Sequence, residues 1–252
     1  MDEPTLPYPK HCHVCGRRLW WRGWVYTPDG MPGETHREGR RDQALVVCRR
    51  CHRNAPRCDG CGAPVGENCI RLPDGRHICP RCHQTAVYDQ ARARELFDRV
   101  VDAITDRLGL GLNVGTDFTL VDHQHLQRLV AESPTPLLDD PSKAVGLFAR
   151  EGRKRVMSVL LGLPQIVFIQ VTAHEWAHAW EVENCPLLRD PVVREGFAEW
   201  VAHKTLQAMG AVKKTMLMER QDSIYGAGLR KMLALEQQVG TAGVLDFCRR
   251  SE

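Results

Sequence analysis

Four Cys-x-x-Cys pairs lie within the first 82 of the 252 residues. With 11 cysteines in the chain, random placement would produce about half of one such pair. Two intervening residues allow both sulfurs of a pair to reach one tetrahedral Zn²⁺, and a second pair completes a four-cysteine site. A disulfide framework is the alternative, but the odd number of cysteines disfavours it, and so does the expectation that the chain has no signal peptide. The N-terminal part is therefore predicted to fold around metal.

The four pairs form two groups when they are taken in chain order. The second group has 17 residues between its pairs, whereas the first has 32, and histidines near the first group could replace one of its cysteines. Cys69 is interpreted as a spare buried thiol. The first group is Cys12, Cys15, Cys48 and Cys51, the second is Cys58, Cys61, Cys79 and Cys82, and the competing histidines are His11, His13, His36 and His52. Closed four-ligand sites are structural, so this half is predicted to scaffold or to recognise a protein partner.

Net charge argues against nucleic-acid binding by this half. Residues 1–88 carry 14 Lys and Arg against 9 Asp and Glu, a balance of +5, and residues 89–252 carry 20 against 22. Eight thiolates with two Zn²⁺ would change the first balance by about −4 and leave no strongly basic surface. The tryptophans Trp20, Trp21 and Trp24 are instead expected to form a contact surface for a partner or for the second domain.

The composition changes near residue 88, where the cysteine-rich part ends. Residues 1–88 are assigned to a double zinc module, because they hold too few apolar residues for a conventional core. In residues 89–252 a few strands precede helices with the apolar period of three to four, which predicts an α+β fold with a small sheet and a mainly helical remainder. No low-complexity tract or repeat is expected. No apolar run reaches about 18 residues, so a cytoplasmic protein without membrane contact is predicted.

Strand and helix boundaries follow from the apolar pattern. Residues 145–150 and 155–161 are predicted strands, and the second is a candidate edge that pairs with an extended substrate. Residues 165–183 and 192–209 are predicted helices, the latter preceded by Pro191 and closed by Gly210. Further helices are expected from residue 213, with breaks around 223–228 and near Gly240.

The first of these helices contains His-Glu-Trp-Ala-His at positions 174–178, an H-E-x-x-H pattern. Random placement in this composition would produce about 0.03 such matches. Histidines four residues apart share one helix face, which suits two ligands of one Zn²⁺, His174 and His178. Glu175 flanks the open coordination position and is the predicted general base.

A catalytic zinc also needs a third protein ligand on a nearby element. Glu195 lies 16 residues past His178, near the start of the next predicted helix, and is the candidate. Glu199 shares its helix face and could accept the second N–H of a ligand histidine. A solvated acidic face is the alternative, but the neighbouring residues are mostly apolar, and unpaired carboxylates in such surroundings are costly.

These motifs resemble those of LIM-domain metallopeptidases known from plants as ubiquitin-activated regulators of organ growth, within the gluzincin class of zinc peptidases. The resemblance covers roughly residues 45–252. Residues 55–87 are similar to the LIM-like module, 160–180 to the strand, Gly-Leu-Pro turn and active helix, 194–206 to the third-ligand helix, and 223–232 to a Tyr-Gly-x-Gly segment.

The resemblance implies LIM-like modules in residues 1–88 followed by a zincin-type, gluzincin-like domain in 89–252. It also implies that Glu195 is the third zinc ligand and that Glu199 orients a ligand histidine. The first module lacks a clear histidine-containing LIM pattern, its spacing to the second is stretched to six residues, and no ubiquitin-interacting helices are expected before Cys12, so ubiquitin activation is not carried over.

The predicted activity is hydrolysis of peptide bonds in a protein or peptide substrate, with one catalytic and two structural Zn²⁺. Zinc would activate water and polarise the scissile carbonyl, while Glu175 takes up a proton and returns it to the leaving amine. Tyr225 is the candidate donor to the developing oxyanion, because Gly226 and Gly228 let its loop approach the site, and His203 is the second candidate. The alternative function is a LIM-type interaction adaptor whose peptidase fold is inactive or tightly regulated.

Overall fold

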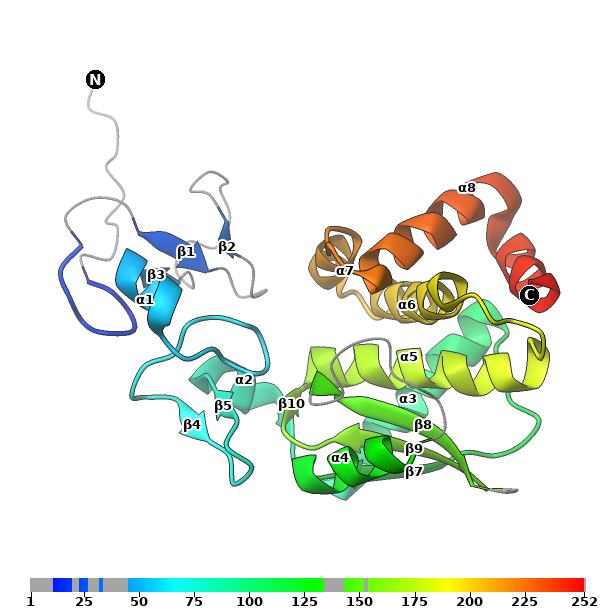
Figure 1. Ribbon diagram of the computed structural model, residues 1–252, viewed down its shortest axis with the longest axis horizontal. Coiled ribbons are helices and arrows are strands. Elements are labelled where there is room, and N and C mark those ends of the chain that lie inside the picture. Colours follow the sequence, from blue (N-terminus) through cyan, green and yellow to red (C-terminus); the bar gives the residue numbers. More distant parts are fainter. Residues whose placement is uncertain are drawn as a thin grey trace. The chain divides into compact units, whose positions relative to one another are not determined.

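The computed structural model divides into two compact units, Met1–Thr85 and Ala86–Glu252. Figure 1 shows short strands and short helices in the first unit, and long helices over a small sheet in the second. The predicted α+β class is confirmed. The residues that the structure describes are 11–19, 23–26, 32–33, 45–133, 143–151 and 154–251.

The first unit consists of two modules, each with a cysteine pair, a small antiparallel sheet, a second cysteine pair and a short helix. In the first module the strands have the order β2-β1-β3 and precede α1, and in the second β4 pairs with β5 before α2. Their bounds are β1 Trp24–Tyr26, β2 Pro32–Gly33, β3 Leu45–Val47, α1 Arg49–Asn54, β4 Ile70–Arg71, β5 His77–Ile78 and α2 Pro80–Thr85.

The two modules repeat one another in their backbone hydrogen bonds. Gly16 and Gly62 follow the first cysteine pair of each module with φ angles of 67° and 71°, and their N–H groups donate to the carbonyls of Cys12 and Cys58 at 2.9 and 2.7 Å. The expectation of no internal repeat is therefore wrong. A shared Cys-x-Arg-Cys-His segment, starting at Cys48 and Cys79, is the sequence signal, and the unequal lengths between the pairs hide it.

The second unit contains a three-stranded sheet of order β7-β9-β8, in which β7 is parallel and β8 antiparallel to β9. The prediction that residues 155–161 form an edge strand is therefore wrong. All but the last of these residues belong to β9, which is central, whereas β8 is an edge. Most of β9 is buried, which is typical of a strand that has neighbours on both sides. The bounds are β6 Ala86–Val87, β7 Asp117–Val121, β8 Gly146–Glu151, β9 Lys154–Leu160 and β10 Leu163–Pro164.

Helices α5 and α6 form the centre of the second unit. In Figure 1 α5 lies over the sheet, α6 lies over α5, and α8 lies over α6. Because both helices are covered on several sides, their apolar residues are not confined to one face. The bounds are α3 Gln90–Leu108, α4 His123–Glu132, α5 Gln165–Asn184, α6 Pro191–Ala208, α7 Val212–Glu219 and α8 Ile224–Arg250.

Local signals position α5 and α6. Gly162, with a φ angle of 77°, turns the chain from β9 towards α5. At the start of α6 the Asp190 carboxylate accepts a hydrogen bond from the Val192 N–H at 2.8 Å, with Pro191 in the first turn. Gly210, with a φ angle of 81°, follows its end as predicted.

Helix α8 begins where a loop was predicted around Tyr225, so that expectation is wrong. Ser223 caps the helix by accepting the Gly226 N–H at 3.2 Å. Gly228 packs directly on Gly196 of α6, and a Cβ on Gly196 would lie 2.7 Å from the Gly228 backbone. The glycines thus permit close helix packing rather than a loop. The predicted break near Gly240 is present, at a φ angle of 69°.

Among the described residues, no helix combines the length and the apolar character that a membrane crossing requires.

Candidate active site and metal centres

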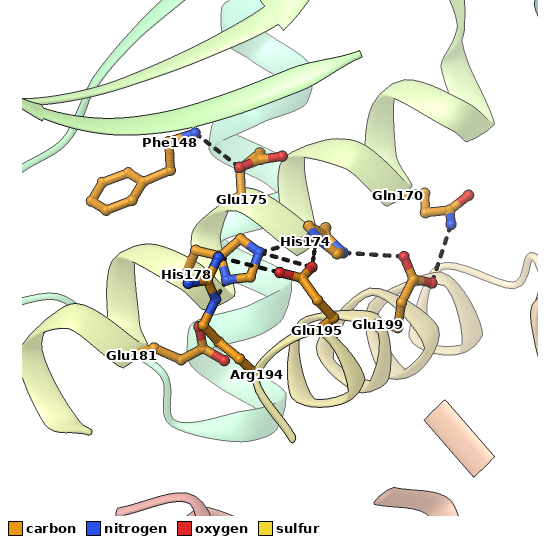
Figure 2. Close-up of polar contacts among 9 residues, drawn as sticks. All are labelled: Phe148, Gln170, His174, Glu175, His178, Glu181, Arg194, Glu195 and Glu199. Carbon is orange, nitrogen blue, oxygen red and sulfur yellow. Dashed lines mark hydrogen bonds and ion pairs between the residues drawn. The ribbon is translucent and has the colours of Figure 1, made fainter. Parts of the chain in front are cut away.

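Helices α5 and α6 bring three predicted ligands to one point. The Nε2 atoms of His174 and His178 lie 3.1 Å apart, and Oε2 of Glu195 lies 3.2 Å from the first and 3.4 Å from the second. Figure 2 shows the three side chains converging from the two helices. These residues form a group that could hold a metal ion.

The spacing of these atoms fits zinc. Tetrahedral ligands at about 2.0–2.1 Å from Zn²⁺ are separated by about 3.3 Å from one another, which the three observed distances match. Two imidazoles and one carboxylate are also a donor set of catalytic zinc sites, which leave a fourth position open.

Each histidine of the group has a carboxylate at its other ring nitrogen. His174 Nδ1 lies 3.1 Å from Oε1 of Glu199, and His178 Nδ1 lies 2.7 Å from Oε2 of Glu181. Such contacts fix the tautomer, so that Nε2 is free to bind metal. Gln170 donates to the other oxygen of Glu199 at 3.4 Å.

Glu181 is a residue that the sequence analysis missed. It lies on α5 three residues after His178, a spacing that places both on one face. Burial raises the pKa of the Glu181 carboxyl, against the opposing attraction of His178. The i, i+3 spacing was a usable signal, but a glutamate three residues along a helix is too common to stand out by itself.

We expect Glu181→Ala and Glu199→Ala each to weaken metal binding at the histidine site about 10 to 100-fold, because each leaves one histidine unoriented. Zinc affinity measured by competition with a chromogenic chelator checks this. Asp98→Ala, which removes an exposed partner of Arg94 on α3, is the control. Unchanged affinity in either glutamate variant would remove that residue's orienting role.

Glu175 faces the sheet edge rather than the ligand group. Its Oε2 accepts a hydrogen bond from the Phe148 N–H on β8 at 2.9 Å. Gly146 makes room for it, because a Cβ there would lie 3.0 Å from the other carboxylate oxygen. The edge strand therefore holds the carboxylate of the H-E-x-x-H glutamate on the β8 side of α5.

A cleft of about 840 Å³ contains this whole arrangement. His174, Glu175, His178, Glu195 and Glu199 all line it. Its other walls come from β8, the C-terminal half of α5, the loop that leads to α6, and the start of α8.

The two candidates for an oxyanion donor lie in different places. Tyr225 lines the cleft, and its ring centroid is 6.0 Å from that of His174. His203 is buried and does not line the cleft, and its Nε2 lies 2.8 Å from Oε1 of Glu219 on α7. The site therefore contains Tyr225 and not His203.

The cysteines form the two groups that chain order predicted. All ligand atoms of each group lie within 4.8 Å of one another, and the Sγ atoms of Cys15 and Cys48, and of Cys61 and Cys79, are 3.9 Å apart. Sulfurs at about 2.3 Å from one tetrahedral Zn²⁺ are separated by about 3.8 Å, so both groups fit zinc. Cys69 is half-buried and belongs to neither group.

Backbone N–H groups stabilise thiolates in both groups. The Cys48 N–H donates to Cys12 Sγ at 3.3 Å, and the Cys79 N–H donates to Cys58 Sγ at 3.2 Å. Hydrogen bonding from Cys61 lowers the pKa of Cys58 to about 6. Thiolates are the form that binds metal.

The histidines near the first cysteine group have other contacts. His13 Nδ1 accepts the Val46 N–H at 2.9 Å, and His52 Nδ1 lies 2.6 Å from the Tyr26 hydroxyl. The His52 ring also stacks on Trp24 at a centroid distance of 3.8 Å. Trp24 is half-exposed, whereas Trp20, Trp21 and His36 lie outside the described residues. His11 is exposed and not part of the cysteine group.

The chain is similar to Protein DA1 of Arabidopsis thaliana. The two are 25% identical over 214 residues, which covers 71% of this chain and 40% of DA1. Protein DA1-related 6 of the same plant is 22% identical over 243 residues, with 80% of this chain and 34% of that protein covered. Protein DA1-related 1 is 24% identical over 186 residues. No protein-family model and no solved structure matches the chain.

The matches thus agree with the resemblance to a plant family that the motifs suggested. The chain spans between 34% and 40% of the length of these curated relatives.

Proposed function

We propose that the chain is a zinc-dependent endopeptidase with a gluzincin-like, zincin-type domain in residues 89–252 and a LIM-like double zinc module in residues 1–88. One observation carries the proposal. Two histidines and a glutamate with zinc spacing, two carboxylates on the outer histidine nitrogens, and the glutamate of the H-E-x-x-H pattern all line one cleft. A purely structural metal site has no use for an adjacent unliganded carboxylate in an open cleft.

Under this proposal His174, His178 and Glu195 hold the catalytic zinc. When bound there, zinc supplies Lewis acidity, which lowers the pKa of water and polarises a carbonyl. Glu175 accepts the proton of the attacking water on its carboxylate and returns it to the leaving amine. Its hydrogen bond to the Phe148 N–H keeps the carboxylate oriented through both transfers.

Tyr225 is the proposed donor to the oxygen that gains negative charge during the attack. Its position in the cleft beside His174 supports this role, because a phenol O–H can donate to an oxyanion in a site with little water. Helix α8 holds it more rigidly than a loop would, since Gly228 packs on Gly196.

The edge strand β8 is the proposed contact for the substrate backbone. Its residues Gly146, Leu147 and Phe148 line the cleft beside Glu175, and β8 lies at the edge of the sheet. An extended peptide could therefore add to this edge in place of the β9 edge that the sequence suggested.

The N-terminal unit is proposed to recruit or regulate rather than to catalyse. Its two cysteine groups have four ligands each and leave no open position. The half-exposed Trp24 on His52 supports a protein-contact surface there. A LIM-type adaptor with an inactive or tightly regulated peptidase fold is the competing function, and its inactive form predicts no metal in the cleft.

Zinc content per chain tests the proposal. We expect three zinc ions per chain in the purified wild-type protein and two in His174→Ala. We also expect the wild-type protein, but not His174→Ala, to hydrolyse an unfolded protein substrate. Two zinc ions in both proteins would favour the adaptor. Three zinc ions without hydrolysis of any denatured protein or peptide library would contradict the peptidase assignment.

A further inference from the structure

The cleft has two chemically different ends along α5. In Figure 2 Gln170 and Glu199 lie on the His174 side, whereas Glu181 and Arg194 lie on the His178 side. The His178 end continues along the last turn of α5 into the loop before α6. Two arginines line this end, one in the loop and one in the first turn of α6.

These two arginines differ in their contacts. Nη2 of Arg194 lies 3.3 Å from Oε1 of Glu195, the oxygen that faces away from the histidines, and its side chain is 32% exposed. Arg189 is exposed, and its guanidinium makes one long contact of 3.5 Å to the Leu188 carbonyl. No carboxylate of the described residues pairs with Arg189.

The carboxylates of the cleft are already committed. Glu175 accepts a backbone N–H, Glu181 and Glu199 contact histidine Nδ1 atoms, and Glu195 contacts both Nε2 atoms and Arg194. None of them is therefore left to neutralise Arg189. A guanidinium offers its N–H groups in a planar fork that matches a carboxylate, which makes a substrate carboxylate the fitting partner.

Apolar side chains line the same end of the cleft. Val182 lies on α5, Cys185 directly follows the end of α5, and Leu188 lies in the loop before α6. Val182 is exposed, so an apolar surface borders the charged one. Such a combination suits a short aliphatic stem that ends in a carboxylate.

We propose that Arg189 and Arg194 form a subsite for a substrate carboxylate beside the scissile bond. This inference rests on the proposed peptidase function and adds its substrate class: peptides with an Asp or Glu side chain, or a C-terminal carboxylate, at the position next to the bond that is cut. Its nearness to the reacting centre follows from the contact between Arg194 and the ligand Glu195.

Paired peptides test the subsite. The probes are libraries of N-acetylated octapeptides of neutral residues, in which one Glu or one Gln is placed at each position in turn. Each library is made once with a C-terminal acid and once with a C-terminal amide. We expect kcat/KM to be about 10 to 100-fold higher for a carboxylate at one position than for its amide counterpart, as for hydrogen bonds to charged groups. A preference for Glu over Gln would identify a side-chain carboxylate as the group that the subsite binds, and a preference for the C-terminal acid over the amide would identify the terminal carboxylate.

Two variants of Arg189 and one control variant test whether Arg189 produces the preference. In Arg189→Gln the acid-to-amide ratio should fall towards one, because only Arg194, which already contacts Glu195, is left at the subsite. In Arg189→Glu the ratio should fall below one, because the new carboxylate repels a substrate carboxylate. Arg107→Gln, an exposed residue on α3 away from the cleft, should keep the wild-type ratio. Cleavage with no acid preference, or a preference that survives Arg189→Glu, overturns the subsite and leaves the peptidase function intact.

If no peptide is cut, peptide binding can test the carboxylate subsite separately from the proposed peptidase function. Fluorescence polarisation with labelled acid and amide peptides can be measured on Glu175→Gln and on Glu175→Gln with Arg189→Gln. If Glu175→Gln binds the acid peptide more tightly than the amide and the double variant does not, the subsite is supported. The missing hydrolysis would in that case contradict only the proposed peptidase function. Equal binding of acid and amide peptides overturns the subsite.

Discussion

Replacing Glu175 by glutamine should lower kcat for peptide hydrolysis about 10² to 10⁴-fold while all zinc stays bound. Glutamine has nearly the same shape, and its amide oxygen can still accept the Phe148 N–H that now orients the carboxylate. The change therefore removes proton transfer and little else. Glu175 is not among the ligand group, so the metal count should not change.

The measurement is single-turnover hydrolysis of an unfolded protein substrate beside zinc content by elemental analysis. Glu95→Gln, an exposed substitution on α3, is the matched control for a lost carboxylate charge. Full turnover by Glu175→Gln would remove the general-base role. Loss of zinc together with turnover would instead mean that Glu175 supports the metal site, and the mechanism would need a different base.

The grouping of the candidate metal ligands was predictable because it follows from helix geometry. Residues four apart on a helix share a face, which places His174 beside His178 on α5 and Glu195 beside Glu199 on α6. The helix boundaries were equally readable, since Pro191 and Gly210 have specific backbone requirements. Local rules were sufficient wherever the residues concerned belong to one element.

The features that sequence reading missed depend on contacts between elements. The order of strands in the sheet makes β8 an edge and β9 the central strand. The apolar pattern within a single strand does not predict this order. Gly226 and Gly228 looked like loop residues, but Gly228 serves the packing of α8 on Gly196. The role of β8 in holding Glu175 likewise required the sheet to be placed against α5.

The N-terminal unit should lose its second module when Cys79 and Cys82 are both replaced by serine. Besides cysteines, the apolar cluster of that module contains Val65, Leu72 and Ile78 with the partly buried Ile70, which is too little for an independent core. A structural zinc contributes about 10–16 kcal/mol to the folding of small domains of this kind. Without it, the ordering entropy of some thirty residues is not offset.

Hydrogen exchange of the full chain measures the effect region by region. In the double variant we expect residues 56–85 to exchange at the rate of an unfolded chain, with one zinc lost, while α5 and α6 stay protected because they have a core of their own. Cys69→Ser, which removes the half-buried thiol outside both cysteine groups, should leave protection and zinc content as they are. Retained protection over residues 56–85 in the double variant would show that this module is held by something other than metal. Its four clustered thiols would then require a different explanation from the one that the 3.9 Å sulfur spacing supports.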